Sequence, residues 1–288
     1  MKIFNKSYFN NFYCEKFDYK KNINLSINYS NIYKDGFIVQ GFCITSDYFI
    51  ISAYSMGCLS RIYLYYRDGS FDKYVELDNK AHVGGVAFDN LNRLLFITGR
   101  HGKINCYSYD DIICGKLKVI DSNINISNDL DGHVSASTIF YYDKSLYICT
   151  CSCSGSMVKY ELEYKNNKVL IVDKSISKCL SSCIQGLVVF NNDNKDYYLI
   201  SQSYSKLKSI IKLFDSNNNF IGQKIIGFKG IEGIELDSFG NINCIFENGN
   251  TKSLIININE LNRDINKRLE YKYFLKGKIH QEKLDKSN

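Results

Sequence analysis

The sequence predicts an all-β protein, a five-bladed β-propeller with four short strands in each blade. Two observations carry this prediction. A polar residue followed by a small residue and alternating apolar positions recurs five times, at intervals of 42, 51, 52 and 47 residues. Each recurrence is followed by a turn-rich stretch and then by further short strands in the same order. Five units of this length match the radial repetition of propellers, which leaves only short, protected sheet edges.

The strands are expected in four sets, one strand of each set in each unit. The first strands are expected at residues 40–44, 82–88, 133–140, 185–190 and 232–236. The second strands are expected at residues 49–54, 95–100, 147–151, 199–204 and 244–248. The third strands are expected at residues 61–66, 103–109, 157–162, 210–214 and 254–259, and the fourth at 74–77, 117–120, 169–172 and 223–226. The first strands are the most continuously apolar, which places them at the packed centre of the ring.

The fifth unit shows no fourth strand after residue 259. Residues 23–29 alternate apolar and polar side chains and could supply this strand, which would close the ring. An open sandwich or solenoid is the competing interpretation, and it would not need this pairing. Apolar residues then recur every four positions from Leu261 to Tyr273, which predicts a short amphipathic helix with a basic outer face. Packing on the propeller rim is the favoured interpretation, and a nucleic-acid or membrane contact is the alternative. We therefore expect one propeller domain at residues 1–260 and a basic C-terminal helix or tail at 261–288.

The composition excludes several classes of protein. Of the 288 residues 45% are hydrophobic, with 23 Tyr and 18 Phe, so the chain can bury a large core and is not disordered or collagen-like. The net charge of +6 falls mainly on residues 263–288, whose eight Lys/Arg against four Asp/Glu give +4. The remaining body is close to neutral, so no nucleic-acid partner is expected.

The location expected from the sequence is the cytoplasm. The N-terminus has no apolar segment of the length that a secretory signal needs, and no long apolar stretch predicts a membrane span. The eleven Cys show no paired metal-ligand spacing, which favours free thiols in a reducing compartment.

The residues that open the five units form the first candidate site. In a propeller the innermost strands surround an axial channel, so these five polar residues should meet at one mouth of it: Gln40, His82, His133, Gln185 and Glu232. Three interpretations remain open. His82, His133 and Glu232 could hold one divalent metal ion, or they could act as acid and base. The ring could also be structural and hold ordered water.

The ends of the second strands form a second candidate ring near the same mouth. Aligning the five second strands on an isoleucine brings Tyr54 and Arg100 to one level, with Glu247 one position earlier and Tyr204 just beyond. Arg100 could hold a carboxylate or phosphate of a ligand, because a guanidinium forks onto such oxygens. The alternative is a solvent-facing loop pair without a ligand.

Several cofactor motifs are missing from the sequence. It contains no phosphate loop, no dinucleotide fingerprint, no G-x-S-x-G and no H-E-x-x-H. No nucleotide cofactor is therefore expected.

The residues of the first unit also carry a resemblance. Val39-Gln40-Gly-Phe, Ile51-Ser-Ala-Tyr-Ser and Arg61-Ile-Tyr-Leu resemble the opening blade of glutaminyl-cyclotransferase-type five-bladed propellers. The spaced His and Glu at strand starts are similar to streptogramin-lyase-type propellers, in which a His and a Glu near a divalent ion do the chemistry. His82-Val-Gly-Gly, Gln185-Gly and Glu232-Gly also resemble uncharacterised bacterial propeller proteins.

The function predicted from these observations is a polar axial pocket that acts on or binds a small polar or peptide-like ligand. The reaction types implied are those of a metal-assisted lyase, a cyclotransferase or a hydrolase. His82, His133 and Glu232 would hold the metal or act as acid and base, and substrate contacts would come from Gln40, Gln185, Tyr54, Arg100, Tyr204 and Glu247. The alternative is a non-catalytic binding module, either lectin-like or a platform for protein interaction.

Overall fold

Short antiparallel sheets are the repeating element of the computed structural model. It describes residues 27–130, 136–150, 155–177, 180–192, 194–203, 208–237, 241–247 and 254–257. Within these ranges lie four units of four strands and one of three. In chain order they are β1 (Ile38–Ile44), β2 (Tyr48–Tyr54), β3 (Arg61–Tyr66), β4 (Phe71–Glu76); β5 (Val86–Asp89), β6 (Leu94–Thr98), β7 (Ile104–Ser108), β8 (Val119–Ser122); β9 (Ala136–Tyr142), β10 (Ser145–Thr150), β11 (Met157–Lys165), β12 (Lys168–Ser177); β13 (Ile184–Asn192), β14 (Lys195–Gln202), β15 (Lys208–Asp215), β16 (Phe220–Lys229); and β17 (Ile231–Leu236), β18 (Asn241–Phe246), β19 (Leu254–Asn257).

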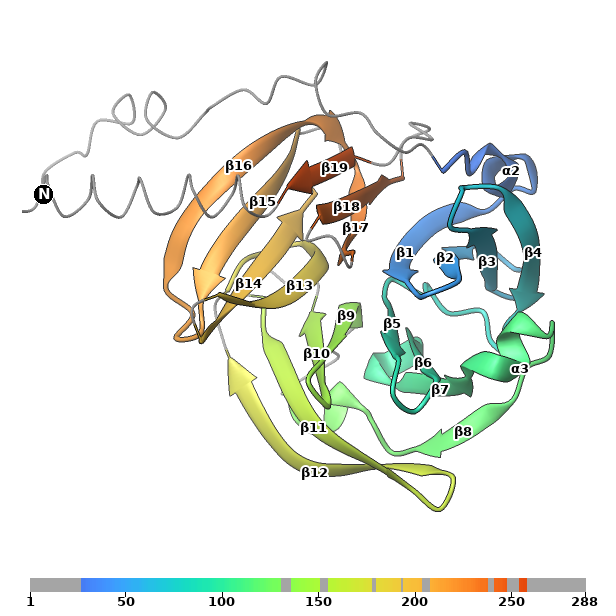
Figure 1. The fold of residues 1–288 in the computed structure, drawn as a ribbon, viewed down its shortest axis with the longest axis horizontal. Helices are drawn as coiled ribbons and strands as arrows, with labels where there is room; N and C mark the ends of the chain where they lie inside the picture. The colour runs from blue at the N-terminus through green and yellow to red at the C-terminus, as the bar shows by residue number, and fades with distance from the viewer. Residues whose placement is uncertain are drawn as a thin grey trace, which may run out of the picture.

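The innermost strands of the five units surround a common centre. β1 contacts β5, β5 contacts β9, β9 contacts β13, β13 contacts β17, and β17 contacts β1 again. Figure 1 shows the sheets arranged radially around this ring, with the later strands of each unit farther out. The predicted all-β propeller class is therefore confirmed.

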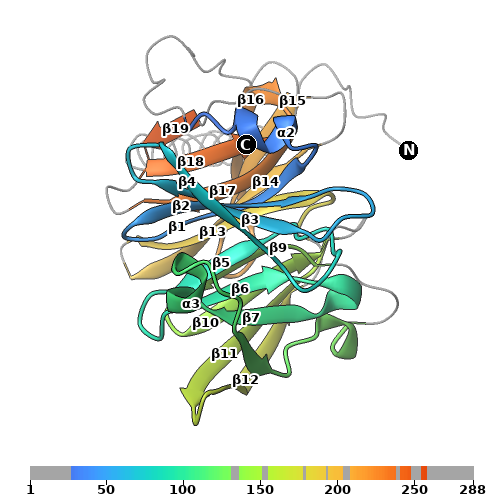
Figure 2. The same cartoon turned by 90° about the vertical axis from the view of Figure 1, so that its right-hand side faces the viewer.

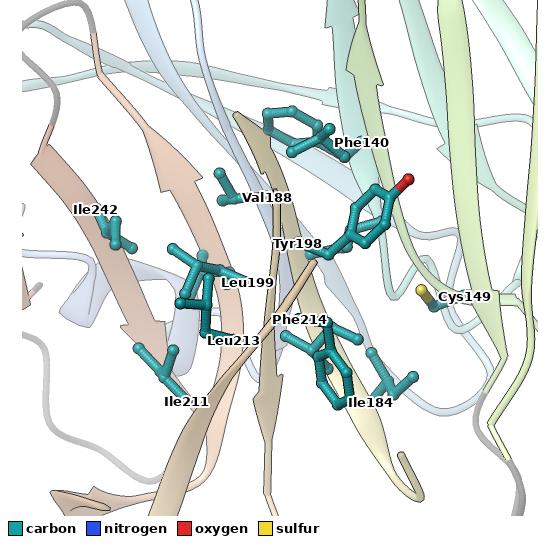
Figure 3. Close-up of a cluster of buried hydrophobic side chains, with 14 of the residues drawn as sticks. Phe140, Cys149, Ile184, Val188, Tyr198, Leu199, Ile211, Leu213, Phe214 and Ile242 are labelled. Atoms are coloured by element: carbon teal, nitrogen blue, oxygen red, sulfur yellow. The ribbon is translucent and has the colours of Figure 1, made fainter. Parts of the chain in front are cut away.

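Apolar side chains fill the spaces between neighbouring units. The largest cluster joins the third, fourth and fifth units through residues such as Cys149, Val188, Leu213 and Ile242 (Figure 3). Separate clusters fill the spaces between the first and second units and between the second and third. Because each sheet is buried on both faces near the centre, its inner strands read as continuous apolar runs in the sequence.

Helical residues occur only as short connections within the described ranges. They are α2 (Ser30–Lys34), α3 (Tyr109–Ile113), η1 (Arg100–Gly102) and η2 (Ile126–Asn128). The Ser108 side chain caps α3 by accepting a hydrogen bond from the Asp111 N–H, as expected for a Ser at this position. No described helix has the length and apolar character needed to cross a membrane.

The N-terminal segment joins the first unit to the fifth, but its described part does so without a strand. Residues 27–29 belong to no strand, and α2 begins at Ser30. The remainder of the strand expected at 23–29 lies outside the described residues, as do the expected C-terminal helix and the boundary at residue 260. Ile27, Tyr29 and Ile32 pack with Val39 of β1 and Ile245 of β18. Figure 2 shows α2 near the end of the molecule that holds β18 and β19.

Two outer strands pair in a way that the sequence did not predict. β8 and β12 lie parallel, with Lys168 opposite Asp121 and Val169 opposite Ser122. This short pairing joins the second and third units into one eight-stranded sheet. An ion pair between Lys168 Nζ and Asp121 Oδ2 (2.8 Å) accompanies it.

Candidate functional site

A β-bulge places the polar opening residue in three of the five units. In the first unit Val39 lies opposite Ala53 and Gly41 opposite Ser52, so Gln40 has no cross-strand partner. The same register shift leaves Gln185 unpaired between Ile184 and Gly186, and Glu232 unpaired between Ile231 and Gly233. Bulges redirect a side chain out of the regular alternation of a strand. These bulges therefore explain why Gln-Gly and Glu-Gly recur in the sequence.

The glycine that follows each bulge is required by space. A Cβ on Gly41 would lie 2.6 Å from the Ser52 Oγ, and one on Gly186 would lie 2.6 Å from the Ser201 Oγ. A Cβ at Gly186 would also lie 2.8 Å from the backbone nitrogen of Ile234 in the next unit, and one at Gly41 would lie 3.1 Å from the Cα of Gly85. The glycine thus allows the inner strand to lie close to the adjacent strands at the bulge that holds the polar residue.

The pairing register corrects the equivalence predicted for the two histidines. In the second unit Val86 lies opposite Ile97, and counting back places Gly84, not His82, at the level of Gln40. In the third unit the bulge falls on Ser137, between Ala136 and Thr138. His133 precedes it by four residues and lies outside the described residues. His82 therefore stands two residues ahead of the predicted ring position.

Two glutamates of the fifth unit make a hydrogen-bonded pair: Glu232 in the inner strand β17 and Glu247 directly after β18. Glu232 is 6% exposed, and its carboxyl group is hydrogen-bonded to that of Glu247. Burial raises the pKa of Glu232 to about 9, and the charge of Glu247 and this hydrogen bond act in the same direction. Two carboxyl groups that share a hydrogen bond must hold a proton between them. Near neutral pH Glu232 therefore keeps its proton.

The register also shows that Glu247 is the counterpart of Tyr54. Gly233 lies opposite Ile245, as Gly41 lies opposite Ser52, so the second strand of the fifth unit is displaced by one residue from the predicted alignment. Glu247 consequently reaches the level of Tyr54 at the end of the second strand. A shift of one residue in the alignment is enough to bring Glu247 to this level and to change the face to which its side chain points, because side chains alternate along a strand.

Two tyrosines of the N-terminal segment hold the chain at Glu247. The buried Tyr29 hydroxyl donates to the Phe246 carbonyl and accepts from the Phe246 N–H, both at 3.2 Å. The Tyr33 hydroxyl donates to the carbonyl oxygen of Glu247 at 2.5 Å. The Glu247 N–H donates to the Gly230 carbonyl at 2.7 Å. The backbone that carries one carboxylate of the pair is thus fixed from both sides.

His82 and Tyr54 lie against each other beside this pair. Their ring centroids are 4.1 Å apart, with the planes tilted by 42°. Desolvation lowers the pKa of His82, while the negative charge of Glu247 acts in the opposite direction. His82 is therefore mainly neutral at pH 7 and can accept a proton or a hydrogen bond.

The other predicted site residues have different positions. Gln40 is buried, and its Nε2 donates to the Val39 carbonyl at 2.8 Å. Gln185 is partly exposed in its bulge. Arg100 is exposed and donates to the Lys80 carbonyl at 3.2 Å, a contact outside the glutamate pair. Tyr204 lies outside the described residues.

A second acid of β17, the partly exposed Glu235, was not predicted as a site residue. Enclosure of its carboxyl group raises its pKa well above the usual range, against a hydrogen bond from the Leu236 N–H. Burial, followed by the charge of Glu235, also raises the pKa of the Cys43 thiol. The signal available in the sequence was a second Glu in the short inner strand that also holds Glu232.

A metal centre was also predicted from His82, His133 and Glu232. Within the described residues, no three His, Cys, Asp or Glu side chains are placed to hold a metal ion. Because His133 is outside these residues, the metal stays a prediction. The seven cysteines that the described ranges show as free thiols are Cys43, Cys58, Cys106, Cys114, Cys149, Cys183 and Cys244.

The fold and this arrangement define the chain as a β-propeller with a carboxyl pair between the inner strand of its fifth unit and the end of the second strand. No protein-family model matches the chain, and no curated protein matches its sequence. A chain in a nidogen–laminin complex is 11% identical, covers 72% of this chain and 72% of its own, and has a TM-score of 0.48. A protein of unknown function from Bacteroides thetaiotaomicron is 12% identical, covers 74% and 57%, and has a TM-score of 0.47. The Dos1 propeller is 11% identical, covers 72% and 52%, and has a TM-score of 0.40.

At these identities no ligand, partner or activity is transferred from those structures to this chain. The resemblance to glutaminyl-cyclotransferase-type and streptogramin-lyase-type propellers stays a prediction from the sequence.

Proposed function

We propose that the protein binds a small polar or peptide-like ligand at one mouth of a five-bladed propeller, and that the Glu232–Glu247 pair exchanges a proton with it. The observation that carries the proposal is the hydrogen bond between the two carboxyl groups, with Glu232 buried and its pKa raised to about 9. Strongly perturbed carboxyl groups beside a specific charge partner are typical of sites that bind or transform a ligand.

The two carboxyl groups have complementary roles in this proposal. Glu232, which keeps its proton at neutral pH, is the hydrogen-bond donor and general acid. Glu247, which is partly exposed, carries the negative charge and accepts a hydrogen bond from an amide or ammonium group of the ligand. A carboxyl group that keeps its proton at neutral pH is a usual choice of general acid in a site.

His82 and Tyr54 supply the neighbouring wall. The neutral imidazole accepts a proton or hydrogen bond, and the tilted Tyr54 ring offers an apolar face. In this arrangement Gln40 is a structural neighbour, because its amide already bonds to the backbone of its own strand.

The test uses the full chain with a mixture of dipeptides and amino-acid amides. Binding is followed by ligand-observed NMR, and turnover by mass spectrometry of the same mixture. We expect Glu247→Gln to weaken binding at least tenfold, since the negative charge is lost. Glu232→Gln, which resembles the protonated acid, should keep binding and abolish turnover.

The control is Glu163→Gln, which changes an exposed glutamate of β11. It should bind and react as the wild type does. Binding that is the same in Glu247→Gln and wild type, or the absence of any bound member of the mixture, would overturn the proposal.

A further inference from the structure

The outer strand of the third unit has a free edge beyond a short pairing. β8 pairs with β12 only as far as Ser122 and Val169, and the chain then turns away toward η2. Among the described residues, no strand pairs with residues 170–177 of β12 on that side. Figure 1 shows β8 and β12 at the outer rim of the ring. The backbone N–H and C=O groups of an unpaired edge are able to bind another strand.

A hollow of about 430 Å³ lies along this free edge. Its lining consists of residues 171–174 of β12 together with Asn123, Asn125, Asn128, Asp129 and Tyr160. Four of these residues are consecutive in β12. The lining also includes Asn123, Asn125 and Asn128, which follow β8 in the chain. The hollow therefore lies on the side of β12 where β8 would have continued.

The inner wall of the hollow is built around one buried carboxylate. The Asp129 side chain is 8% exposed and accepts hydrogen bonds from the Tyr160 hydroxyl and the Lys174 ammonium group. Lys174 is thereby neutralised by Asp129. Asp173, exposed at the edge, leaves the hollow with one net negative charge. The three Asn side chains add amides, which can donate and accept hydrogen bonds.

The same edge exposes apolar side chains. Val172 is 57% exposed, and Leu170, Ile171 and Ile176 are also exposed. Natural proteins normally protect a free edge with charges, proline or a covering segment. On this edge Lys174 is already paired with Asp129, so its apolar side chains and the polar hollow lie together with one unpaired charge, that of Asp173.

We infer that the free edge of β12 binds an extended segment of a partner protein, which adds as a strand beside residues 170–174 and carries a basic side chain next to Asp173. Backbone hydrogen bonds to the edge hold the segment, and its apolar side chains pack on Ile171 and Val172. A bulge at Val172, between the Ile171–Leu162 and Asp173–Glu161 pairs, bends the edge. Such a bend limits pairing to a short segment and disfavours long pairing with a second copy of the chain.

The experiment is selection of a displayed library of random eight-residue peptides on the full chain. We expect enrichment of peptides that alternate apolar residues with Lys or Arg. Synthesised peptides from the selection are then measured by fluorescence anisotropy against wild type, Asp173→Lys and Asp47→Lys. Asp47 is an exposed residue of the first unit, so Asp47→Lys makes the same charge change away from the hollow.

Asp173→Lys should weaken binding at least tenfold, and Asp47→Lys should leave it unchanged. Peptides with N-methylated alternate residues should lose binding, because the backbone donors are blocked while the side chains remain. Hydrogen exchange should show protection of residues 170–174 when the peptide is bound. Failure to enrich any peptide, equal binding by Asp173→Lys, tolerance of N-methylation, or protection elsewhere would each overturn the inference.

Discussion

The pH dependence of stability provides a direct test of the buried Glu232 carboxyl group. Its pKa of about 9 in the folded protein compares with a usual value of 4.5, so the folded state keeps a proton that the unfolded state loses. The stability that this proton contributes is complete below pH 4.5 and is lost as the pH rises toward 9. In Glu232→Gln the side chain cannot ionise, so this loss disappears.

The size of the effect follows from the linkage of protonation and folding. Each pH unit between the two pKa values costs about 1.4 kcal/mol, so wild type should lose about 3 kcal/mol relative to Glu232→Gln between pH 6 and pH 8. The assay is urea unfolding of both proteins at pH 6, 7 and 8, with Glu163→Gln as the control that follows wild type. If the free energies of unfolding of wild type and Glu232→Gln run parallel with pH, the reasoning about the pair is wrong.

Three further predictions concern the surroundings of the pair. Tyr33→Phe should lower the free energy of unfolding by about 1 kcal/mol, because the hydrogen bond from its hydroxyl to the Glu247 carbonyl is lost. Tyr74→Phe, at an exposed position, should change the free energy of unfolding little. Equal effects of the two changes would contradict the role of Tyr33. Gly186→Ala should destabilise by about 1–3 kcal/mol in urea unfolding, since its Cβ would lie 2.8 Å from the Ile234 nitrogen; an unchanged midpoint would refute the close approach. Proton NMR titration should give His82 a pKa below its usual 6.5. Glu247→Gln should lower the pKa of His82 further, because the carboxylate charge that raises this pKa is removed. A higher pKa of His82 in Glu247→Gln would show that the two groups are not neighbours.

The propeller class could be predicted because its main signal is periodic. Apolar inner strands and turn residues recur at each unit, and these features depend on local sequence. The parallel pairing of β8 with β12 could not be predicted in the same way. It depends on how two outer strands from different units meet in space, and Asp121 and Ser122 carry no local sign of it.

The candidate site was predicted in part, and the errors have a common cause. The Gln-Gly and Glu-Gly dipeptides did mark equivalent positions, because each contains a bulge residue followed by a glycine. The sequence pattern does not show the bulges themselves. The residue equivalent to Gln40 was therefore predicted at the wrong position in the second and third units. The sequence predicts His82 as a ring residue, whereas the register assigns that level to Gly84. The partnership of Glu232 with Glu247 arises from strand register and could not be seen in either residue alone.

The most direct test of the account is the protonation of Glu232 itself. Carbon-13 NMR of labelled glutamate side chains, titrated from pH 5 to pH 10 and assigned with Glu232→Gln, would report its carboxyl group. The account predicts a midpoint near 9 for Glu232, which should fall in Glu247→Gln as the neighbouring charge is removed. A midpoint near 4.5 in wild type would contradict the shared proton and, with it, the proposed acid and base.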